Sequence, residues 1–380
     1  MTTYLDHAAT TPMRAEVVEA MLHWLGGVHG NPSGSHRLAR EARRAVDDAR
    51  DALAATLGCQ PGELVFTSGG TEADNLAVAG VTAARPGTVA VCSAIEHHAV
   101  LDPVLALGGR LAAVDARGLV ELDALSDLLD PTVGLVSVML ANNEVGTVQP
   151  LDAVAAVVAE HAPAAVLHTD AVQAFPWLDV APLVAAAALV SISGHKVGGP
   201  NGVGALVVRK GTPLAPQLLG GGQERGRRSG SHNVAGIVGL GIAARLCAED
   251  RDEVVARTGA LRDRLADGLL ATVPDAFESA VTVPGDRAHK IAGSCHLCFD
   301  GVEAESLLFL LDQEGICASA ASSCSSGAAE PSHVLAALGV PTARAGGSLR
   351  LSLGRTTTAA DVDHALQAVP AAVARIRGAS

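Results

Sequence analysis

Side chains able to do chemistry lie where short apolar runs of this sequence end. Thr71 comes after the run Leu64–Thr67, and His97 comes after Val89–Ser93. The full set of such side chains is Thr71, His97, Asn143, Asp170, Gln173, Ser193, His195 and Lys196. Short continuous apolar runs are typical of strands buried on both faces of a parallel sheet, whose carboxyl ends meet at one edge. We therefore expect these side chains to form a single site.

The residue types in this set predict a cofactor that carries an aldehyde and a phosphate. Lys196 follows a buried strand, where desolvation lowers the pKa of an amine and favours a Schiff base. Asp170 also ends a buried strand, where a carboxylate requires a cation such as a protonated pyridine nitrogen. Gly70 and Thr71 open a helix whose N–H groups can bind phosphate, but the lysine of a nucleotide-triphosphate loop is missing. This combination indicates pyridoxal 5′-phosphate.

Seven stretches, spread over nearly the whole chain, carry a resemblance to a known family. They are Tyr4–Pro12, Phe66–Glu72, Ala141–Gly146, Ser193–Lys196, Gly220–Gly226, Ser323–Ser325 and Ser348–Arg355. In these stretches the sequence resembles the cysteine desulfurases of the NifS/IscS type, within the class V aminotransferase family. The resemblance implies the fold type I of pyridoxal-phosphate-dependent transferases, a homodimer and L-cysteine as substrate.

The resemblance also implies a role for each residue around the cofactor ring. Lys196 should be bonded to the aldehyde, and Asp170 should pair with the ring nitrogen. Asn143 and Gln173 should lie near the ring hydroxyl, while His97 should stack on the ring and assist proton transfer.

Further residues are implied to bind the phosphate and the substrate. Gly70, Thr71, Ser193 and His195 should hold the phosphate, and Arg350, with Asn143, should hold the substrate carboxylate. Ser231 should reach the phosphate bound by the partner subunit; a threonine is usual there, and the hydroxyl is kept.

Cys324 matches the nucleophile of the family, which takes sulfur from the substrate as a persulfide. Its surroundings, Ser322–Gly327, depart from the common Gly-Ser-Ala-Cys-Thr form but keep the thiol. The expected products are L-alanine and a Cys324 persulfide for a sulfur-acceptor protein, either an iron–sulfur scaffold or a thiolation enzyme. Two alternatives remain: a selenocysteine or C–S lyase that does not use Cys324, and a non-enzymatic sulfur-carrier scaffold.

Two other groups of residues could suggest a metal, and both have a simpler interpretation. His97 and His98 are adjacent, so their side chains diverge, and no third ligand stands near them in the sequence. Cys295 and Cys298 lie in an expected strand, where residues three apart point to opposite faces. We expect buried core thiols and no metal.

Composition limits the possible partners and compartments. The chain has 380 residues, 49% of them hydrophobic, and its net charge of −13 argues against direct binding to nucleic acid. The longest apolar stretch, Val180–Ile192, contains Pro182 and is too short to span a bilayer, so no membrane contact is expected. No start resembling a signal peptide is present, and the odd, scattered cysteines favour the cytoplasm.

The alternation of apolar runs with helical stretches predicts an α/β fold. A large, doubly wound and mainly parallel domain is expected over residues 13–252, and a smaller α+β domain over 1–12 and 253–380. One helix is expected from Pro12, with its buried face at Val17, Val18, Met21, Leu22 and Leu25. A second is expected over Leu38–Leu57 with Gly58 as its cap, and a long one over residues 233–270.

Overall fold

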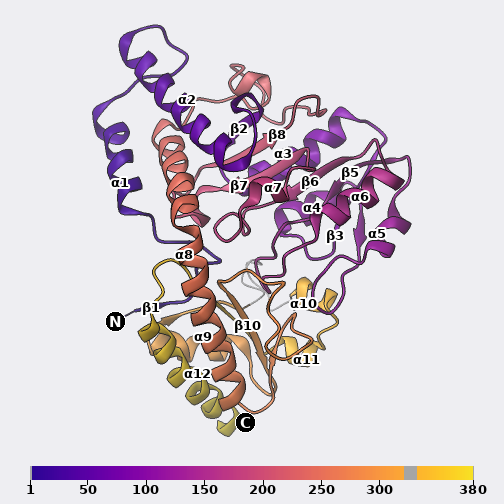
Figure 1. Ribbon diagram of the computed structural model, residues 1–380, viewed down its shortest axis with the longest axis vertical. Coiled ribbons are helices and arrows are strands. Elements are labelled where there is room, and N and C mark those ends of the chain that lie inside the picture. The colour runs from indigo at the N-terminus through magenta and orange to yellow at the C-terminus, as the bar shows by residue number, and fades with distance from the viewer. Residues whose placement is uncertain (1, 321–331, 380) are drawn as a thin grey trace.

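The computed structural model describes residues 2–320 and 332–379, and it consists of two parts that share one helix (Figure 1). Helix α8, Val234–Thr272, runs from the part that holds the large sheet into the smaller part. The predicted boundary at residue 252 falls inside this helix, where the chain continues without a break. The exact division of the chain into domains therefore stays a prediction.

The larger part is built on a seven-stranded sheet of order β2-β8-β7-β6-β5-β3-β4. Strand β8 is antiparallel to both of its neighbours, and the other adjacent pairs are parallel. In sheet order the strands are Leu64–Thr67, Gly204–Val208, Leu189–Ser193, Val166–Asp170, Val133–Ser137, Val89–Ser93 and Arg110–Ala112. The structure therefore confirms the predicted α/β fold with a mainly parallel sheet.

Helices cover both faces of this sheet, as the continuous apolar strands require. Alternate strand residues point to opposite faces, so Val65 packs with α3 and α4 while Phe66 packs with α2 and α8. The helices before α8 are α1 (Ala15–Leu22), α2 (Arg37–Leu57), α3 (Gly70–Ala84), α4 (His98–Ala106), α5 (Leu122–Leu128), α6 (Leu151–His161) and α7 (Val180–Leu183). Helix α2 ends at Gly58 with φ of 60°, the left-handed conformation that favours glycine there.

The first helix differs from its prediction. Helix α1 begins at Ala15 rather than Pro12, and a π-helical turn over His23–Gly27 follows it. Val17 is buried, but Val18, Leu22 and Leu25 of the expected buried face are exposed in this chain. The apolar spacing correctly predicts a helix. It does not show whether the apolar face of that helix packs against its own chain or against another surface.

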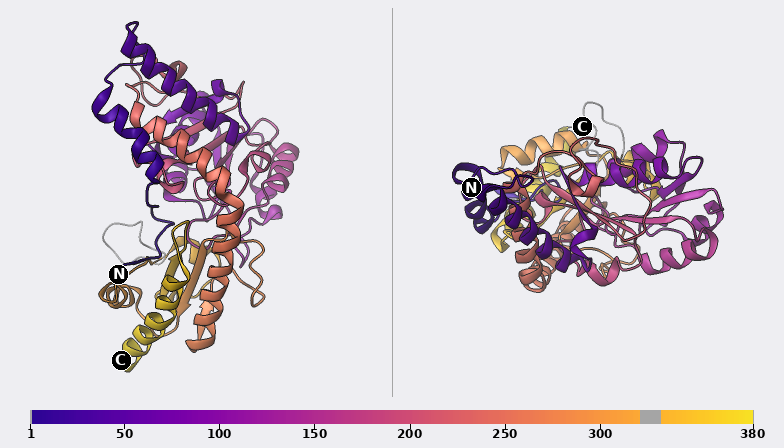
Figure 2. Two further views of the ribbon diagram at one scale, coloured as in Figure 1. Left: turned by 60° about the vertical axis from the view of Figure 1, so that its left-hand side comes forward. Right: turned by 90° about the horizontal axis from the view of Figure 1, so that it is seen from above.

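The smaller part has a three-stranded antiparallel sheet, with β10 (Ser294–Phe299) between β12 (Ser348–Ser352) and β9 (Ala276–Glu278). The first strand of the chain, β1 (Thr3–Tyr4), pairs in parallel with β11 (Ile316–Cys317). The helices of this part are α9 (Ala304–Gln313), α10 (His333–Ala337), α11 (Thr342–Ala345) and α12 (Ala359–Ala379). Helix α12 lies beside the second half of α8 (Figure 2).

The cysteines of the described chain are free thiols. Cys295 and Cys298 are fully buried, and they belong to different apolar clusters on opposite faces of β10. Cys59 and Cys317 are only half-buried, so they are less enclosed than the core thiols. No described helix combines the length and the apolar character needed to cross a membrane.

Candidate active site

The strand ends of the large sheet surround a cavity of about 310 Å³. This volume lies at the lower end of the range of about 300–1,000 Å³ that is typical of small-molecule sites. The predicted residues that line the cavity are Gly70, Thr71, His97, Asn143, Asp170, Gln173, Ser193, His195, Lys196 and Arg350. Ser231 is not among the lining residues, and Cys324 lies outside the described residues.

Asp170 is the last residue of β6, and it provides a buried carboxyl in the cavity wall. Its Oδ1 atom accepts a hydrogen bond from the backbone N–H of Val172 at 2.8 Å. Burial raises the pKa of Asp170 to about 6, although that bond and the charge of Lys196 oppose the shift. A cationic group bound beside it would stabilise the ionised form.

Lys196 ends a short turn, Gly194–Lys196, that directly follows β7. Its Nζ atom donates to the carbonyl oxygens of Ala8 and Ala9, the latter at 2.7 Å. Gln173 Nε2 also donates to the Ala8 carbonyl, at 2.8 Å. The segment before α1 thus forms one wall of the cavity, a role that sequence patterns did not reveal because alanine carbonyls carry no signal.

His97 is neutral in this environment. Its Nδ1 atom accepts a hydrogen bond from the backbone N–H of Ala99 at 3.1 Å, so it begins helix α4. Burial, together with the charge of Lys196, lowers the pKa of His97 to about 4. Because Nδ1 accepts, the single ring proton of the neutral imidazole is on Nε2.

The other end of the cavity suits an anion. Helix α3 begins at Gly70, and the first N–H groups of a helix have no partners within it. A Cβ atom at Gly70 would lie 3.0 Å from Val172 Cγ2 and would narrow the cavity beside Ser193. Gly204 of β8 is also required, because its Cβ would come within 2.6 Å of the carbonyl carbon of Gly69.

The cavity is also lined by an acid, Asp74, that was not among the predicted site residues. Asp74 lies on α3 three residues after Thr71, a helical spacing that would have indicated a shared face. It is buried, and burial together with the Asp170 charge raises its pKa well above the usual range. Burial and the Asp170 charge therefore both favour the neutral form of Asp74.

Arg350, in β12, brings a buried guanidinium from the smaller part to the cavity lining. Its Nη2 atom donates to Asp6 Oδ1 at 3.0 Å, and its Nη1 atom donates to the Asn143 carbonyl at 3.2 Å. The buried Nε atom has no hydrogen-bond partner within the described chain. A substrate carboxylate is the group that this arrangement suits.

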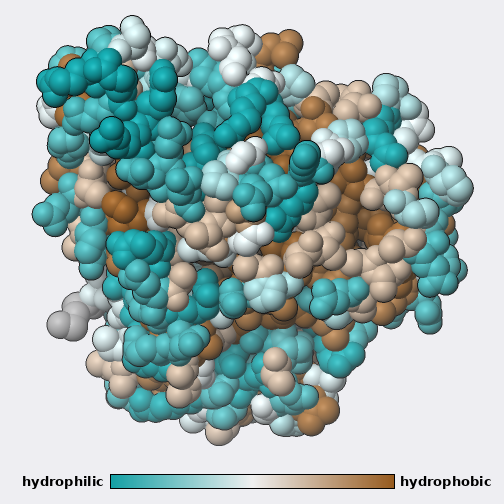
Figure 3. Space-filling model, turned by 45° about the horizontal axis from the view of Figure 1, so that its top comes forward, coloured by the Kyte–Doolittle hydropathy of each residue, from teal (hydrophilic) through white to brown (hydrophobic). Residues whose placement is uncertain are grey.

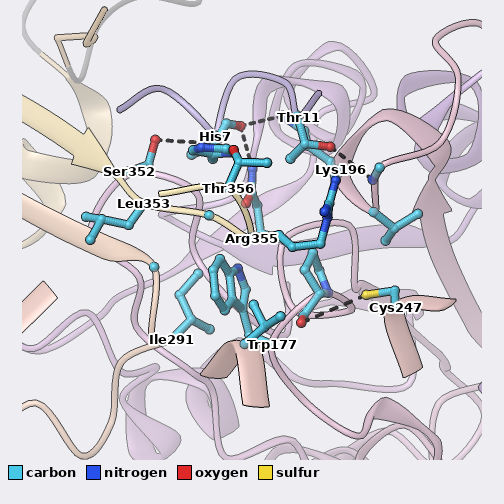
Figure 4. A pocket seen from close by; sticks show the side chains of 18 of the residues that line it. His7, Thr11, Trp177, Lys196, Cys247, Ile291, Ser352, Leu353, Arg355 and Thr356 are labelled. Carbon is cyan, nitrogen blue, oxygen red and sulfur yellow. Dashed lines mark hydrogen bonds between the residues drawn. The ribbon is translucent and has the colours of Figure 1, made fainter. Parts of the chain in front are cut away.

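Lys196 also borders a second, smaller cavity of about 60 Å³ (Figure 4). Trp177, Ile291 and Leu353 line it together with the thiol of Cys247. The sulfur of Cys247 faces the Pro176 carbonyl at 4.0 Å. Burial raises the pKa of Cys247 to about 11, so this thiol is not a thiolate at neutral pH.

The larger cavity fits pyridoxal 5′-phosphate on three independent grounds. Lys196 brings an amine for the aldehyde, Asp170 brings a buried carboxyl for the ring nitrogen, and a helix N-terminus with small neighbours faces the phosphate end. Together with the sheet that positions these groups, they define a pyridoxal-phosphate-dependent enzyme of fold type I.

Comparison with known proteins identifies the family within that class. Residues 3–365 match the family model for Aminotransferase class-V, and the chain belongs to this family. It is 44% identical to an "IscS-like cysteine desulfurase" of Mycobacterium tuberculosis, over 99% of this chain and 98% of that protein.

Solved structures agree with this assignment. A "NifS-like protein" superimposes with a TM-score of 0.91 and 33% identity, covering 99% of this chain and all of that one. A structure described as "SspA in complex with cysteine" has a TM-score of 0.80 and 31% identity, covering 94% of this chain and all of that one.

Proposed function

We propose that the protein is a cysteine desulfurase, which converts L-cysteine to L-alanine and leaves the sulfur as a persulfide on Cys324. The observation that carries this proposal is the placement of Lys196, Asp170 and Arg350 around one cavity. Relatives named as cysteine desulfurases over the full length of the chain support it. A structural neighbour described in complex with cysteine supports the choice of substrate.

The positions of Lys196, Arg350 and His97 suit different roles in the proposed reaction. Bound pyridoxal 5′-phosphate supplies an aldehyde and a ring that withdraws electrons from the substrate α-carbon. Lys196 holds the cofactor before the substrate arrives, and its freed amine then accepts the α-proton. Arg350 orients the substrate carboxylate, and the Nε2 proton of His97 is available to a group over the ring.

The sulfur step then balances without an outside oxidant. The Cys324 thiolate attacks the substrate sulfur, forming an S–S bond while the C–S bond breaks. The electron pair of the C–S bond stays with the carbon side, which gains protons and leaves as L-alanine. One cysteine substrate and one enzyme thiol thus yield one alanine and one enzyme persulfide.

We further propose that the enzyme is a homodimer in which Ser231 binds the phosphate held by the partner subunit. Ser231 is exposed and does not line the cavity of its own chain, which agrees with a role across an interface. Exposed apolar side chains such as Leu22, Leu25 and Leu219 support an interface. Brown apolar areas interrupt the hydrophilic surface on the face that Figure 3 shows.

For the persulfide we propose a protein acceptor in the cytoplasm, either an iron–sulfur scaffold or a thiolation enzyme. The names of IscS-type relatives support the first of these. Free thiols at the described cysteines are consistent with a reducing compartment.

The test is a single turnover of the purified holoenzyme with L-cysteine, analysed by mass spectrometry. We expect one sulfur atom on the peptide that contains Cys324, none on Cys317, and one alanine for each sulfur. Cys324→Ser should keep the cofactor and the spectral change on adding cysteine, yet form little alanine. Wild-type turnover by Cys324→Ser would instead favour a C–S or selenocysteine lyase.

A further inference from the structure

Glu144 and Ser332 form a buried contact outside the residues assigned to the reaction. Glu144 lies in the turn after β5, next to Asn143, and is 6% exposed. Ser332 is the first described residue after 321–331 and is 5% exposed. The Ser332 hydroxyl donates a hydrogen bond to Glu144 Oε2 at 2.5 Å.

The same serine begins helix α10, which fixes the direction of its hydroxyl proton. Ser332 Oγ accepts from the backbone N–H of Leu335 at 3.2 Å, so its own proton is left for Glu144. The next residue, His333, donates from Nε2 to the Glu96 carbonyl at 2.9 Å. The start of α10 is therefore tied to the turn after β3 and to the turn after β5.

The turn that carries Glu144 is itself held firmly. Asn142 Oδ1 accepts from the backbone N–H groups of Glu144 and Val145, both at 2.9 Å. Asn142 Nδ2 donates to the Ile95 carbonyl at 2.9 Å, which joins this turn to the one before His97. Glu144 is thus a fixed acceptor, one residue along the chain from Asn143 of the cavity lining.

The chain on the other side of residues 321–331 is also fixed beside the cavity. Ser319 and Arg350 exchange two backbone hydrogen bonds, of 2.7 and 3.3 Å. The described residues that bracket the Cys324 segment are therefore tied to Arg350 at one end and to the neighbour of Asn143 at the other.

A carboxyl at position 144 makes the folded protein less stable than an apolar side chain of the same size would, because the buried acid loses its hydration. Burial raises the pKa of Glu144 to about 7, although Ser332, Arg350 and His98 all favour its ionised form. Among the described residues, the Ser332 hydroxyl is the side chain that donates a hydrogen bond to this carboxyl.

We propose that Glu144 is a positioning residue for the nucleophile: by fixing Ser332, it sets the position of the first described residue after the segment bearing Cys324. This inference rests on the proposed transfer of sulfur to Cys324. Glu144 acts through Ser332 and needs no contact with the substrate, so its loss should impair sulfur transfer and leave substrate binding intact.

The test separates these two steps in the holoenzyme. Glu144→Ala and Ser332→Ala should each slow the appearance of sulfur on Cys324 about tenfold in a single turnover, which corresponds to about 1.4 kcal/mol. The L-cysteine concentration that half-saturates the visible spectral change should shift less than about twofold. Glu144→Gln keeps the acceptor oxygen and should retain most of the rate, and the double alanine variant should be no slower than the slower single variant.

The control is a pair of the same residue types on the surface. Ser306 Oγ donates to Glu303 Oε2 at 2.6 Å at the exposed start of α9, so Ser306→Ala should leave the transfer rate unchanged. A transfer rate in both alanine variants equal to that of wild type, or a parallel loss of cysteine binding, would overturn the proposal.

A second measurement does not depend on sulfur transfer. Without cysteine, alkylation of Cys324 by iodoacetamide should be faster in Ser332→Ala than in Ser306→Ala, with Cys317 in the same sample as reference. If wild type places no sulfur on Cys324, the proposed function is wrong, and this measurement alone decides the positioning role. Equal alkylation rates would then overturn it.

Discussion

Lys196 is the lysine whose position suits attachment of the cofactor. The chain has three lysines, Lys196, Lys210 and Lys290. Lys210 is exposed, and Lys290 is buried beside Glu278 with Nζ 3.5 Å from its carboxylate, away from the cavity lining. Only Lys196 combines access to the cavity with proximity to Asp170.

We therefore predict that Lys196→Ala removes covalent attachment of the cofactor. After borohydride reduction, peptide mass spectrometry should find the cofactor on Lys196 in wild type and on no peptide of the variant. Lys210→Ala is the matched control and should behave as wild type. Cofactor fixed to another lysine in the Lys196 variant would show that the assignment is wrong.

Glu144 predicts a dependence of stability on pH. Its pKa in the folded protein is about 7, against an ordinary value of 4.5, so the unfolded chain loses this proton first as pH rises. The folded state therefore loses relative stability between these two values, by up to about 3 kcal/mol. Glu144→Gln lacks this titration.

Urea unfolding of both holoenzymes at several pH values measures this effect. The difference in unfolding free energy, variant minus wild type, should increase from pH 4.5 to pH 7 and then level off. A difference that stays flat across this range would mean that the Glu144 pKa is close to its ordinary value.

At the scale of single residues, the sequence predicted most of the residues that line the cavity, because the end of each short apolar run marks the end of a strand. Thr71, His97, Asn143, Asp170 and Lys196 were brought together as expected, since parallel strands place their carboxyl ends at one edge. The carbonyls of Ala8 and Ala9 could not be found, because a backbone contact leaves no trace in residue type. The roles assigned to the lining residues stay predictions until their variants are measured.

At the scale of secondary structure, one buried ion pair joins three separate elements. Arg50 of α2 donates hydrogen bonds from both terminal nitrogens to the Glu224 carboxylate, at 2.7 and 2.9 Å. The same carboxylate accepts a hydrogen bond from the backbone N–H of Phe66 in β2. His232 Nε2 lies 2.7 Å from the same carboxylate. Burial alone would raise the pKa of Glu224, but these bonds lower it to about 2.

We predict that Arg50→Ala lowers the free energy of unfolding by about 3–5 kcal/mol, because it leaves the buried Glu224 carboxylate without the guanidinium that neutralises its charge. The Arg245–Glu249 pair is the control: it is as short, at 2.6 Å, but about half-exposed. Arg245→Ala should cost at most about 1 kcal/mol. Equal losses in the two variants, measured by denaturant unfolding, would contradict this account.

The elements that sequence patterns predicted best are those buried by their own chain. The bounds of β2 and β3 match the apolar runs Leu64–Thr67 and Val89–Ser93, because both strands are buried along nearly their whole length. Strand β5 ends at Ser137, although Val138–Leu140 stays buried beyond it. Burial alone therefore does not mark the end of strand pairing.

At the scale of the whole molecule, the proposed dimer makes a specific prediction for Ser231. Ser231→Ala should raise the dissociation constant for the cofactor about tenfold, since a hydrogen bond to a charged group is worth roughly 1.5–3 kcal/mol. Ser231→Thr keeps the hydroxyl and should bind the cofactor like wild type. Equilibrium dialysis gives the constant, and sedimentation velocity should show that both variants remain dimers.

A fully active, cofactor-saturated monomer would contradict both the dimer and the role of Ser231. The same sedimentation experiment on Leu25→Glu tests the exposed apolar face of the π-helical turn after α1. This variant should shift toward monomer if that face lies in the interface.

The continuity of helix α8 limits how the protein can be divided by engineering. Leu240 in its first half belongs to the core of the large sheet, and Leu265 and Leu269 in its second half belong to the core of the smaller part. A gene cut at residue 252 would give two fragments, each ending in half a helix whose apolar residues belong to a core completed elsewhere. Exchange of the smaller part between relatives, or its display as an independent module, should therefore carry α8 whole.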